Sequence, residues 1–221
     1  MITKPDLGGF SHPARFPAEV VSVLRRHLVG CHRILDPFAG TGRIHILGDY
    51  GHETWGIEIE PEWAGLHPRT IVGNALCLPF AGGTFAGVAT SPTYANRLAD
   101  HHNAQDGSVR RSYTHDLGRA LHRDNSGAMQ WGDPYRRFHK AAWAEAARML
   151  RPGGRLVLNI KDHVRDKRPQ PVAEWHRATL ERLGFEWLLT EPVPTRHLKQ
   201  GENDHRAGPE LVMVFVKGNP S

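Results

Sequence analysis

Two short segments combine acidic, glycine or hydroxyl-bearing residues in patterns typical of ligand-binding loops. One is DPFAGTG at residues 36–42, which lies between a predicted strand and a predicted helix and is followed by the acidic Glu58 at the end of the next strand. Gly40 and Gly42 would let a ligand approach the backbone at a helix N-terminus, and a carboxylate one strand over can accept hydrogen bonds from two ribose hydroxyls. A GxG spacing by itself is equally typical of an ordinary tight turn, so the whole block carries this prediction.

The other segment is SPTY at residues 91–94, at the end of a further apolar strand. Loops that follow the carboxyl ends of parallel strands form the ligand sites of α/β proteins, so this position favours a functional turn over a plain Ser-Pro junction. Neither segment requires a metal ion, and no compact pair of metal ligands with the usual spacing stands out. Cys31 and Cys77 are far apart and form no CxxC motif, which predicts reduced thiols.

Strands and helices alternate along the chain in an order that would position both segments. Apolar runs predict strands at 32–36, 54–60, 70–75, 86–91, 155–160, 185–191 and 211–216. Helical spacing predicts helices at 17–28, 44–51, 61–66, 133–150 and 171–184, the fourth of them with Asp133 as N-cap and Pro134 at its first position. The alternation predicts a doubly wound, seven-stranded, Rossmann-like α/β sheet of parallel strands, in one domain over residues 1–221 with a polar insertion at about 95–133.

Composition and charge set the class of protein and of partner. The 221 residues are 39% hydrophobic and carry 28 Lys+Arg against 23 Asp+Glu, a formal net charge of +5. This balance fits one globular domain and excludes collagen-like, coiled-coil and wholly disordered chains, while the positive charge favours a polyanionic partner. The sequence shows neither an apolar run of membrane-spanning length nor a signal-peptide core, so we expect a cytoplasmic protein that makes no membrane contact.

At this point the sequence resembles the class I S-adenosylmethionine-dependent methyltransferases, in the branch that methylates exocyclic amines of DNA bases. DPFAGTG matches the DPFxGxG motif of that branch, and SPTY resembles its SPPY variant of the catalytic motif. Further similar segments are HPARFP at 12–17, GIEIEPE at 56–62, GNALCLPF at 73–80 and LRPGGRLVLNIKD at 150–162. The resemblance covers nearly the whole chain, and the motif order is that of the branch often called gamma.

The resemblance implies S-adenosylmethionine as cofactor and assigns residues to it. Asp36, Phe38, Gly40 and Gly42 would surround its methionine part, Glu58 would bind the ribose and Asn74 the adenine edge. His12 and Pro13 would close one side of the pocket. Asn74 departs from the usual carboxylate at its position, but an amide oxygen can still accept a hydrogen bond.

The SPTY turn would act on the target amine. An exocyclic amine is a poor nucleophile because its lone pair is delocalised into the ring, so catalysis needs acceptors that hold its N–H groups out of the ring plane. Ser91 Oγ and the Pro92 carbonyl would supply these acceptors, and Tyr94 would stack on the flipped base. Thr93 replaces the usual second proline, which leaves the turn less constrained. By the resemblance, Ser91 favours cytosine N4 over adenine N6.

DNA is the predicted macromolecular partner, with RNA base methylation as the first alternative and a catalytically retired cofactor- or nucleic-acid-binding protein as the second. The chain leaves no room for a separate target recognition domain, so we expect it to recognise a short or degenerate target sequence or to have help from a second subunit. Trp131 is a candidate substrate-facing aromatic. The predicted nucleic-acid contacts are Arg97, Arg110, Arg111, Lys161 and Arg165. The alternative is that these residues belong to solvated loops without a ligand.

Overall fold

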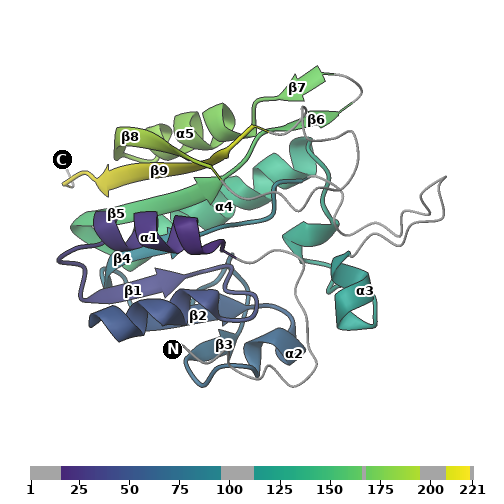
Figure 1. Ribbon diagram of the computed structural model, residues 1–221, viewed down its shortest axis with the longest axis horizontal. Helices are drawn as coiled ribbons and strands as arrows, with labels where there is room; N and C mark the ends of the chain where they lie inside the picture. The colour runs from purple at the N-terminus through teal and green to yellow at the C-terminus, as the bar shows by residue number, and fades with distance from the viewer. Residues whose placement is uncertain (1–15, 96–111, 166–167, 195–207, 220–221) are drawn as a thin grey trace.

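A computed structural model describes residues 16–95, 112–165, 168–194 and 208–219. Seven strands form one sheet in the order β3-β2-β1-β4-β5-β9-β8, shown in Figure 1. The strands of this sheet are β1 (Arg33–Asp36), β2 (Glu53–Glu58), β3 (Thr70–Val72), β4 (Phe85–Thr90), β5 (Leu150–Ile160), β8 (Phe185–Val193) and β9 (Glu210–Lys217). The prediction of a seven-stranded α/β sheet is therefore confirmed.

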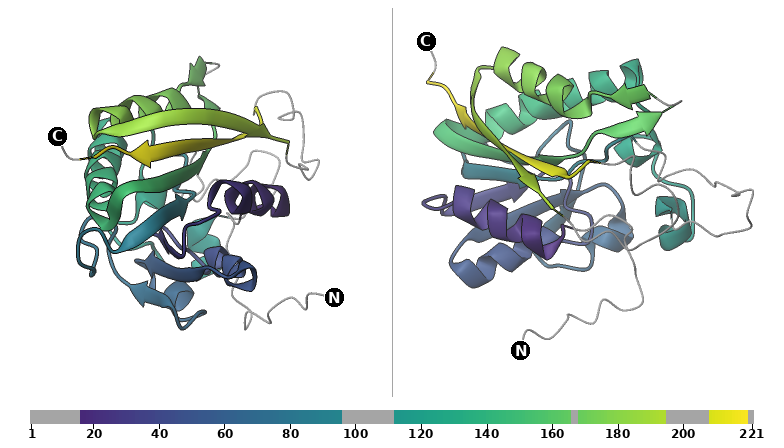
Figure 2. Two further views of the ribbon diagram at one scale, coloured as in Figure 1. Left: turned by 90° about the vertical axis from the view of Figure 1, so that its left-hand side faces the viewer. Right: turned by 45° about the horizontal axis from the view of Figure 1, so that its top comes forward.

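Helices cover both faces of the sheet. Their bounds are α1 (Ala18–His27), the 3₁₀ helix η1 (Arg43–Tyr50), α2 (Pro61–Ala64), α3 (Tyr113–Leu117), the 3₁₀ helix η2 (Ser126–Ala128), α4 (Asp133–Met149) and α5 (Val172–Arg182). Figure 2 shows α1 on one side of the sheet and α4 with α5 on the other. Neighbouring strand residues point to opposite faces, so Val88 packs in the cluster under α4 and α5, and Ala89 packs in the cluster under α1 and η1.

The last strand differs from the prediction of parallel strands. β9 pairs antiparallel with both β5 and β8, whereas β3, β2, β1, β4 and β5 run parallel. Antiparallel neighbours can be joined by a loop, while parallel neighbours need a crossover that is usually helical. The polar stretch from Pro194 to Pro209 supplies no such helical pattern. The sheet is therefore mixed, and β9 begins at the edge where the parallel strands end.

Three local details also differ from the predicted elements. Gly132, not Asp133, is the N-cap of α4, without a side-chain cap, so Asp133 lies inside the first turn. The Pro152-Gly153-Gly154 segment is part of β5, which pairs with β4 from Leu150 onward. A small hairpin, β6 (His163–Arg165) with β7 (Arg168–Gln170), follows β5. Among the described helices, none combines the length and apolar character needed to cross a membrane.

Candidate functional site

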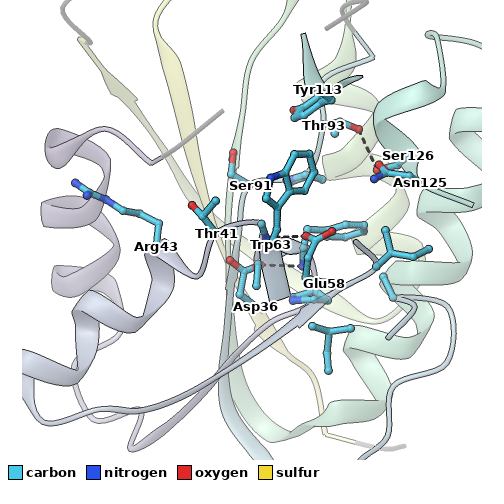
Figure 3. A pocket seen from close by; sticks show the side chains of 18 of the residues that line it. Asp36, Thr41, Arg43, Glu58, Trp63, Ser91, Thr93, Tyr113, Asn125 and Ser126 are labelled. Carbon is cyan, nitrogen blue, oxygen red and sulfur yellow. Dashed lines mark hydrogen bonds between the residues drawn. The ribbon is translucent and has the colours of Figure 1, made fainter. Parts of the chain in front are cut away.

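A cavity of about 280 Å³ opens at the carboxyl ends of β1, β2 and β4. Both chemistry-bearing segments of the sequence line it, as Figure 3 shows for Asp36, Glu58 and Ser91. Eight of the predicted site residues lie in this wall: Asp36, Phe38, Gly40, Glu58, Asn74, Ser91, Pro92 and Tyr94. The fold thus brings together the two groups of residues that the sequence assigns to a nucleoside ligand and to a target amine.

Glu58 holds the glycine loop against the end of β2. One carboxylate oxygen accepts the backbone N–H of Gly40 at 2.8 Å, and the other accepts that of Glu60 at 2.9 Å. Gly40 has a φ of 52°, a left-handed conformation that glycine adopts without steric cost. Burial raises the pKa of Glu58 to about 7. A carboxylate has about four acceptor positions, so Glu58 keeps capacity for hydroxyl donors from a ligand in the cavity.

Asp36 links the same loop to the end of β4. Its Oδ1 accepts the Phe38 backbone N–H at 2.9 Å and the Thr90 hydroxyl at 2.6 Å, which ties the ends of β1 and β4 together. Burial raises the pKa of Asp36 to about 7. Gly42 lies outside the cavity lining, at the N-cap of η1 with a φ of 74°. A Cβ there would stand 2.9 Å from Cδ2 of His45, so the position requires glycine for close packing as well as for its backbone.

Asn74 follows β3 and forms a small turn beside the cavity. Its Oδ1 accepts the backbone N–H of Leu76 at 2.9 Å, and its carbonyl accepts that of Cys77, also at 2.9 Å. These bonds fix the orientation of the amide. Asn74 lines the cavity together with Gly73 and Ala75.

A hydrogen-bond network surrounds the SPTY turn. The Tyr94 hydroxyl donates to Glu210 at 2.8 Å and lies 2.8 Å from Ser91 Oγ. Because the single Tyr94 proton goes to Glu210, the bond between the two hydroxyls must use the Ser91 proton. Asn159 Nδ2 lies 3.2 Å from Ser91 Oγ and 2.8 Å from Tyr94 Oη. Ser91 can therefore still accept one hydrogen bond from the cavity.

Thr93 is anchored on two sides. Its hydroxyl donates to Ser126 at 3.0 Å, and its carbonyl accepts the Tyr135 hydroxyl at 2.7 Å. Tyr135 in turn lies 3.0 Å from His176 Nε2, and Trp143 donates to His176 Nδ1 at 2.9 Å. His176 is therefore the neutral tautomer that carries its proton on Nε2, in agreement with burial lowering its pKa well below the usual value.

Part of the polar insertion folds over the cavity, and Figure 1 shows α3 beyond the arrowheads of β1 and β5. Arg119 holds this part in place through ion pairs to Glu60 at 2.8 Å and to Glu62 at 2.6 Å. Glu60 is fully buried and also accepts the Asn125 amide at 2.7 Å. The insertion adds four residues to the cavity wall, Tyr113, Asp124, Asn125 and Ser126.

Sequence reasoning missed several residues of the wall. Glu210 precedes an apolar strand, and only the register of the folded sheet places it in the wall, where Asn159, a residue behind the wall, contacts both Glu210 and Ser91. Trp63 is buried and also lines the cavity. Trp131 is outside the cavity lining, because it packs on Tyr135 and Trp175, which corrects the suggestion that it faces substrate.

Most of the remaining predicted contacts lie outside the part of the chain that the structure describes. His12, Pro13, Arg97, Arg110 and Arg111 lie outside the described residues. Lys161 follows β5, and its ammonium lies 3.9 Å from Glu210, with the side chain 12% exposed. Arg165 ends β6, but its side chain is outside the described part of the structure. The nucleic-acid contacts therefore stay predictions.

Comparisons with known proteins place the fold. No protein-family model matches the chain, and neither does any curated protein. Solved structures do match it. An S-adenosylmethionine-dependent methyltransferase from Methanosarcina mazei superposes with a TM-score of 0.57 at 15% identity, over 90% of this chain and 98% of the other. A TehB-like methyltransferase from Corynebacterium glutamicum gives 0.51 at 20% identity, over 87% and 86%.

The cyclase SpnF also matches, with a TM-score of 0.55 at 15% identity over 96% of this chain and 88% of its own. Identities of this size show the fold alone. A fold shared by methyltransferases and a cyclase does not decide the reaction, so the chemistry has to be argued from the residues of the cavity.

Proposed function

We propose that this protein is an S-adenosylmethionine-dependent methyltransferase that methylates an exocyclic amino group of a DNA base, with cytosine N4 favoured over adenine N6. One observation carries the proposal. The Ser91–Tyr94 turn and the Gly40–Glu58 pair line a single cavity, although they come from different strands of the sheet. One cavity therefore holds hydrogen-bond acceptors for a ribose and for an amine, so the cofactor and the target base can bind in it together.

The residues of the cavity fit the cofactor. Glu58 is a buried carboxylate with acceptor capacity for two ribose hydroxyls, and the Asn74 amide has its orientation fixed at the neighbouring wall. Phe38 and Ile57 add apolar surface to the wall. When bound, S-adenosylmethionine supplies a methyl group on a sulfonium, and the chain's part is to hold and orient it against the amine.

The amine side of the cavity is built from the SPTY turn. Ser91 Oγ has one lone pair left for an amine N–H, and Pro92 follows it in the lining. The Tyr94 hydroxyl is anchored to Glu210, which fixes the ring beside the place where a flipped base would stack. Thr93 lacks the stiffness of a proline, but its two hydrogen bonds restrain the turn instead. These contacts support an active site over a retired one.

Nucleoside identification tests the proposal. The protein is incubated with radiolabelled cofactor and, separately, duplex DNA, single-stranded DNA or total RNA, after which each nucleic acid is digested and its nucleosides separated. We expect label in N4-methylcytosine from DNA, abolished by Ser91→Ala, with S-adenosylhomocysteine affinity unchanged in calorimetry. Label only in RNA, or only in a small molecule, would contradict the DNA assignment. Binding of S-adenosylhomocysteine without any methyl transfer would instead indicate a protein that has kept the cofactor site but lost catalytic activity.

A further inference from the structure

Glu210 is a carboxylate that lies at the target end of the cavity. It is the first residue of β9, and it lines the cavity together with Ser91 and Tyr94. Its side chain is 13% exposed. Because β9 runs antiparallel to β5, its starting end meets the edge where the parallel strands finish. The position is outside every motif that the sequence offers for the site.

The hydrogen bonds around Glu210 have one consistent direction. Tyr94 donates to Glu210 Oε2 at 2.8 Å, and Ser91 must donate to Tyr94 over 2.8 Å. Asn159 can only donate through Nδ2, which faces Ser91 Oγ, Tyr94 Oη and Glu210 Oε2 at 3.2, 2.8 and 3.1 Å. Ser91, Tyr94 and Glu210 therefore form a continuous chain of O–H···O hydrogen bonds that ends on the Glu210 carboxylate.

We propose that Glu210 is the terminal acceptor of the proton that the target amine loses, and that Ser91 and Tyr94 pass this proton on. The proposal rests on the proposed function and deepens it, because it assigns a proton path to the same site. The ammonium of Lys161 lies 3.9 Å from the other carboxylate oxygen of Glu210.

The step balances without a further reactant. The amine lone pair forms the new N–C bond while the S–C bond breaks and its electron pair stays on sulfur. The nitrogen then carries one proton too many. Ser91 Oγ accepts that proton on its remaining lone pair and passes its own hydrogen to Tyr94 Oη, which releases its hydrogen to Glu210 Oε2. Both hydroxyls end neutral, and Glu210 ends protonated until it exchanges with water.

Glu210→Gln is the informative variant because glutamine keeps the size of the side chain and its carbonyl can still accept from Tyr94, but it cannot take up the proton. In single-turnover methyl transfer to DNA we expect the rate to fall about a hundredfold, the size typical of a lost general base. Binding of S-adenosylhomocysteine, measured by calorimetry, should not change. Glu186→Gln, on an exposed position of β8, is the matched control.

Two further variants separate proton transfer from mere positioning. Tyr94→Phe keeps the ring but interrupts the path, so it should slow transfer, and adding Glu210→Gln to it should cost little more. Glu210→Ala leaves space for a small carboxylate, so added formate should restore part of its rate while leaving Glu210→Gln unchanged.

The outcomes that refute the relay differ from those that refute the function. Wild-type transfer to DNA with a Glu210→Gln rate within about twofold of it, or formate without effect on Glu210→Ala, overturns the relay alone. A wild-type protein that transfers no methyl group to DNA or RNA overturns the proposed function, and the relay with it.

Discussion

At the scale of single residues, Thr93 shows how a turn can be restrained without a proline. Its hydroxyl is held by Ser126 of the insertion, and its carbonyl by Tyr135 of α4. The Tyr135 hydroxyl is in turn held by His176, whose other nitrogen accepts from Trp143. The conformation that a second proline would fix by its ring is fixed here by hydrogen bonds from outside the turn.

Tyr135→Phe tests this support. Loss of the hydroxyl leaves the Thr93 carbonyl and the His176 N–H without their partner, so we expect about 1 to 3 kcal/mol lower stability in urea unfolding. The maximal rate of methyl transfer should also fall, while S-adenosylhomocysteine affinity stays as it was. Tyr50→Phe, at an exposed tyrosine, should change neither quantity. An unaltered rate in Tyr135→Phe would show that the turn holds itself.

Glu58 should make ligand binding depend on pH. Burial raises the pKa of Glu58 to about 7, and ribose hydroxyls donate to its charged form. Affinity for S-adenosylhomocysteine should therefore increase as the pH rises through about 7, and binding below that pH should release a proton. Calorimetry in buffers of different ionisation enthalpy measures both effects. Glu58→Gln should bind weakly at every pH, and a pH dependence retained in that variant would point to Asp36 instead, whose pKa is also raised to about 7.

At the scale of elements, the part of the insertion from Ser112 to Ala128 is a short structured segment that Arg119 links to the residues at the end of β2 and in α2. Arg119 reaches the buried Glu60 and the half-buried Glu62 of α2. Removing it would leave Glu60 buried beside fewer donors, which is costly for a charged group. The segment carries Tyr113, Asn125 and Ser126 into the cavity wall.

Arg119→Ala should therefore loosen the segment and weaken binding. We expect faster amide hydrogen exchange over residues 112–128, while the exchange of β4 and β5 stays slow. S-adenosylhomocysteine affinity should drop several-fold because part of the wall is lost. Arg123→Ala removes a side chain that is 89% exposed from the same segment and serves as the control. Equal exchange in both variants would mean that the ion pairs do not hold the segment.

The elements were more predictable than the network between them. β4 and the second half of β5 are short buried apolar runs, and α4 repeats its buried residues, among them Phe138, Ala142 and Ala146, at helical spacing. The closeness of the glycine loop to Glu58 follows from two motifs one strand apart, although their hydrogen bond was not predicted. Glu210 could not be found this way, because its neighbours in space depend on the direction of β9 and on its register with β5. Such pairings arise from tertiary structure, which local patterns do not encode.

At the scale of the whole molecule, buried histidines and buried carboxyl groups have opposite effects on how the stability depends on pH. Burial lowers the pKa of His45 and of His139 to about 3 and that of His176 well below its usual value. These histidines take up protons only on unfolding, so their contribution to stability is lost as the pH falls below about 6.5. Asp36 and Glu58, with raised pKa values, hold protons in the folded state, and their contribution is lost as the pH rises through about 7.

Between about pH 4.5 and 6.5 the three histidines outweigh the two carboxyl groups by one proton, which corresponds to about 1.4 kcal/mol of stability lost per pH unit as the pH falls. We therefore expect the free energy of unfolding, measured with urea, to fall by about 1.4 kcal/mol per pH unit over that range and more steeply below about pH 4.5. In the double variant Asp36→Asn, Glu58→Gln the compensation is gone, so the fall below pH 6.5 should be about three times as steep. Equal slopes in the wild type and the double variant would contradict the raised carboxyl pKa values.

The strand order has a consequence for how the chain is made. β8 is synthesised before β9, yet in the described sheet it pairs only with β9, which enters between β8 and β5. While β9 is still inside the ribosome, β8 has no neighbour and β5 presents an open edge. The half of the sheet from β3 to β5 can assemble on the nascent chain, but the edge that holds Glu210 closes only after its last strand emerges.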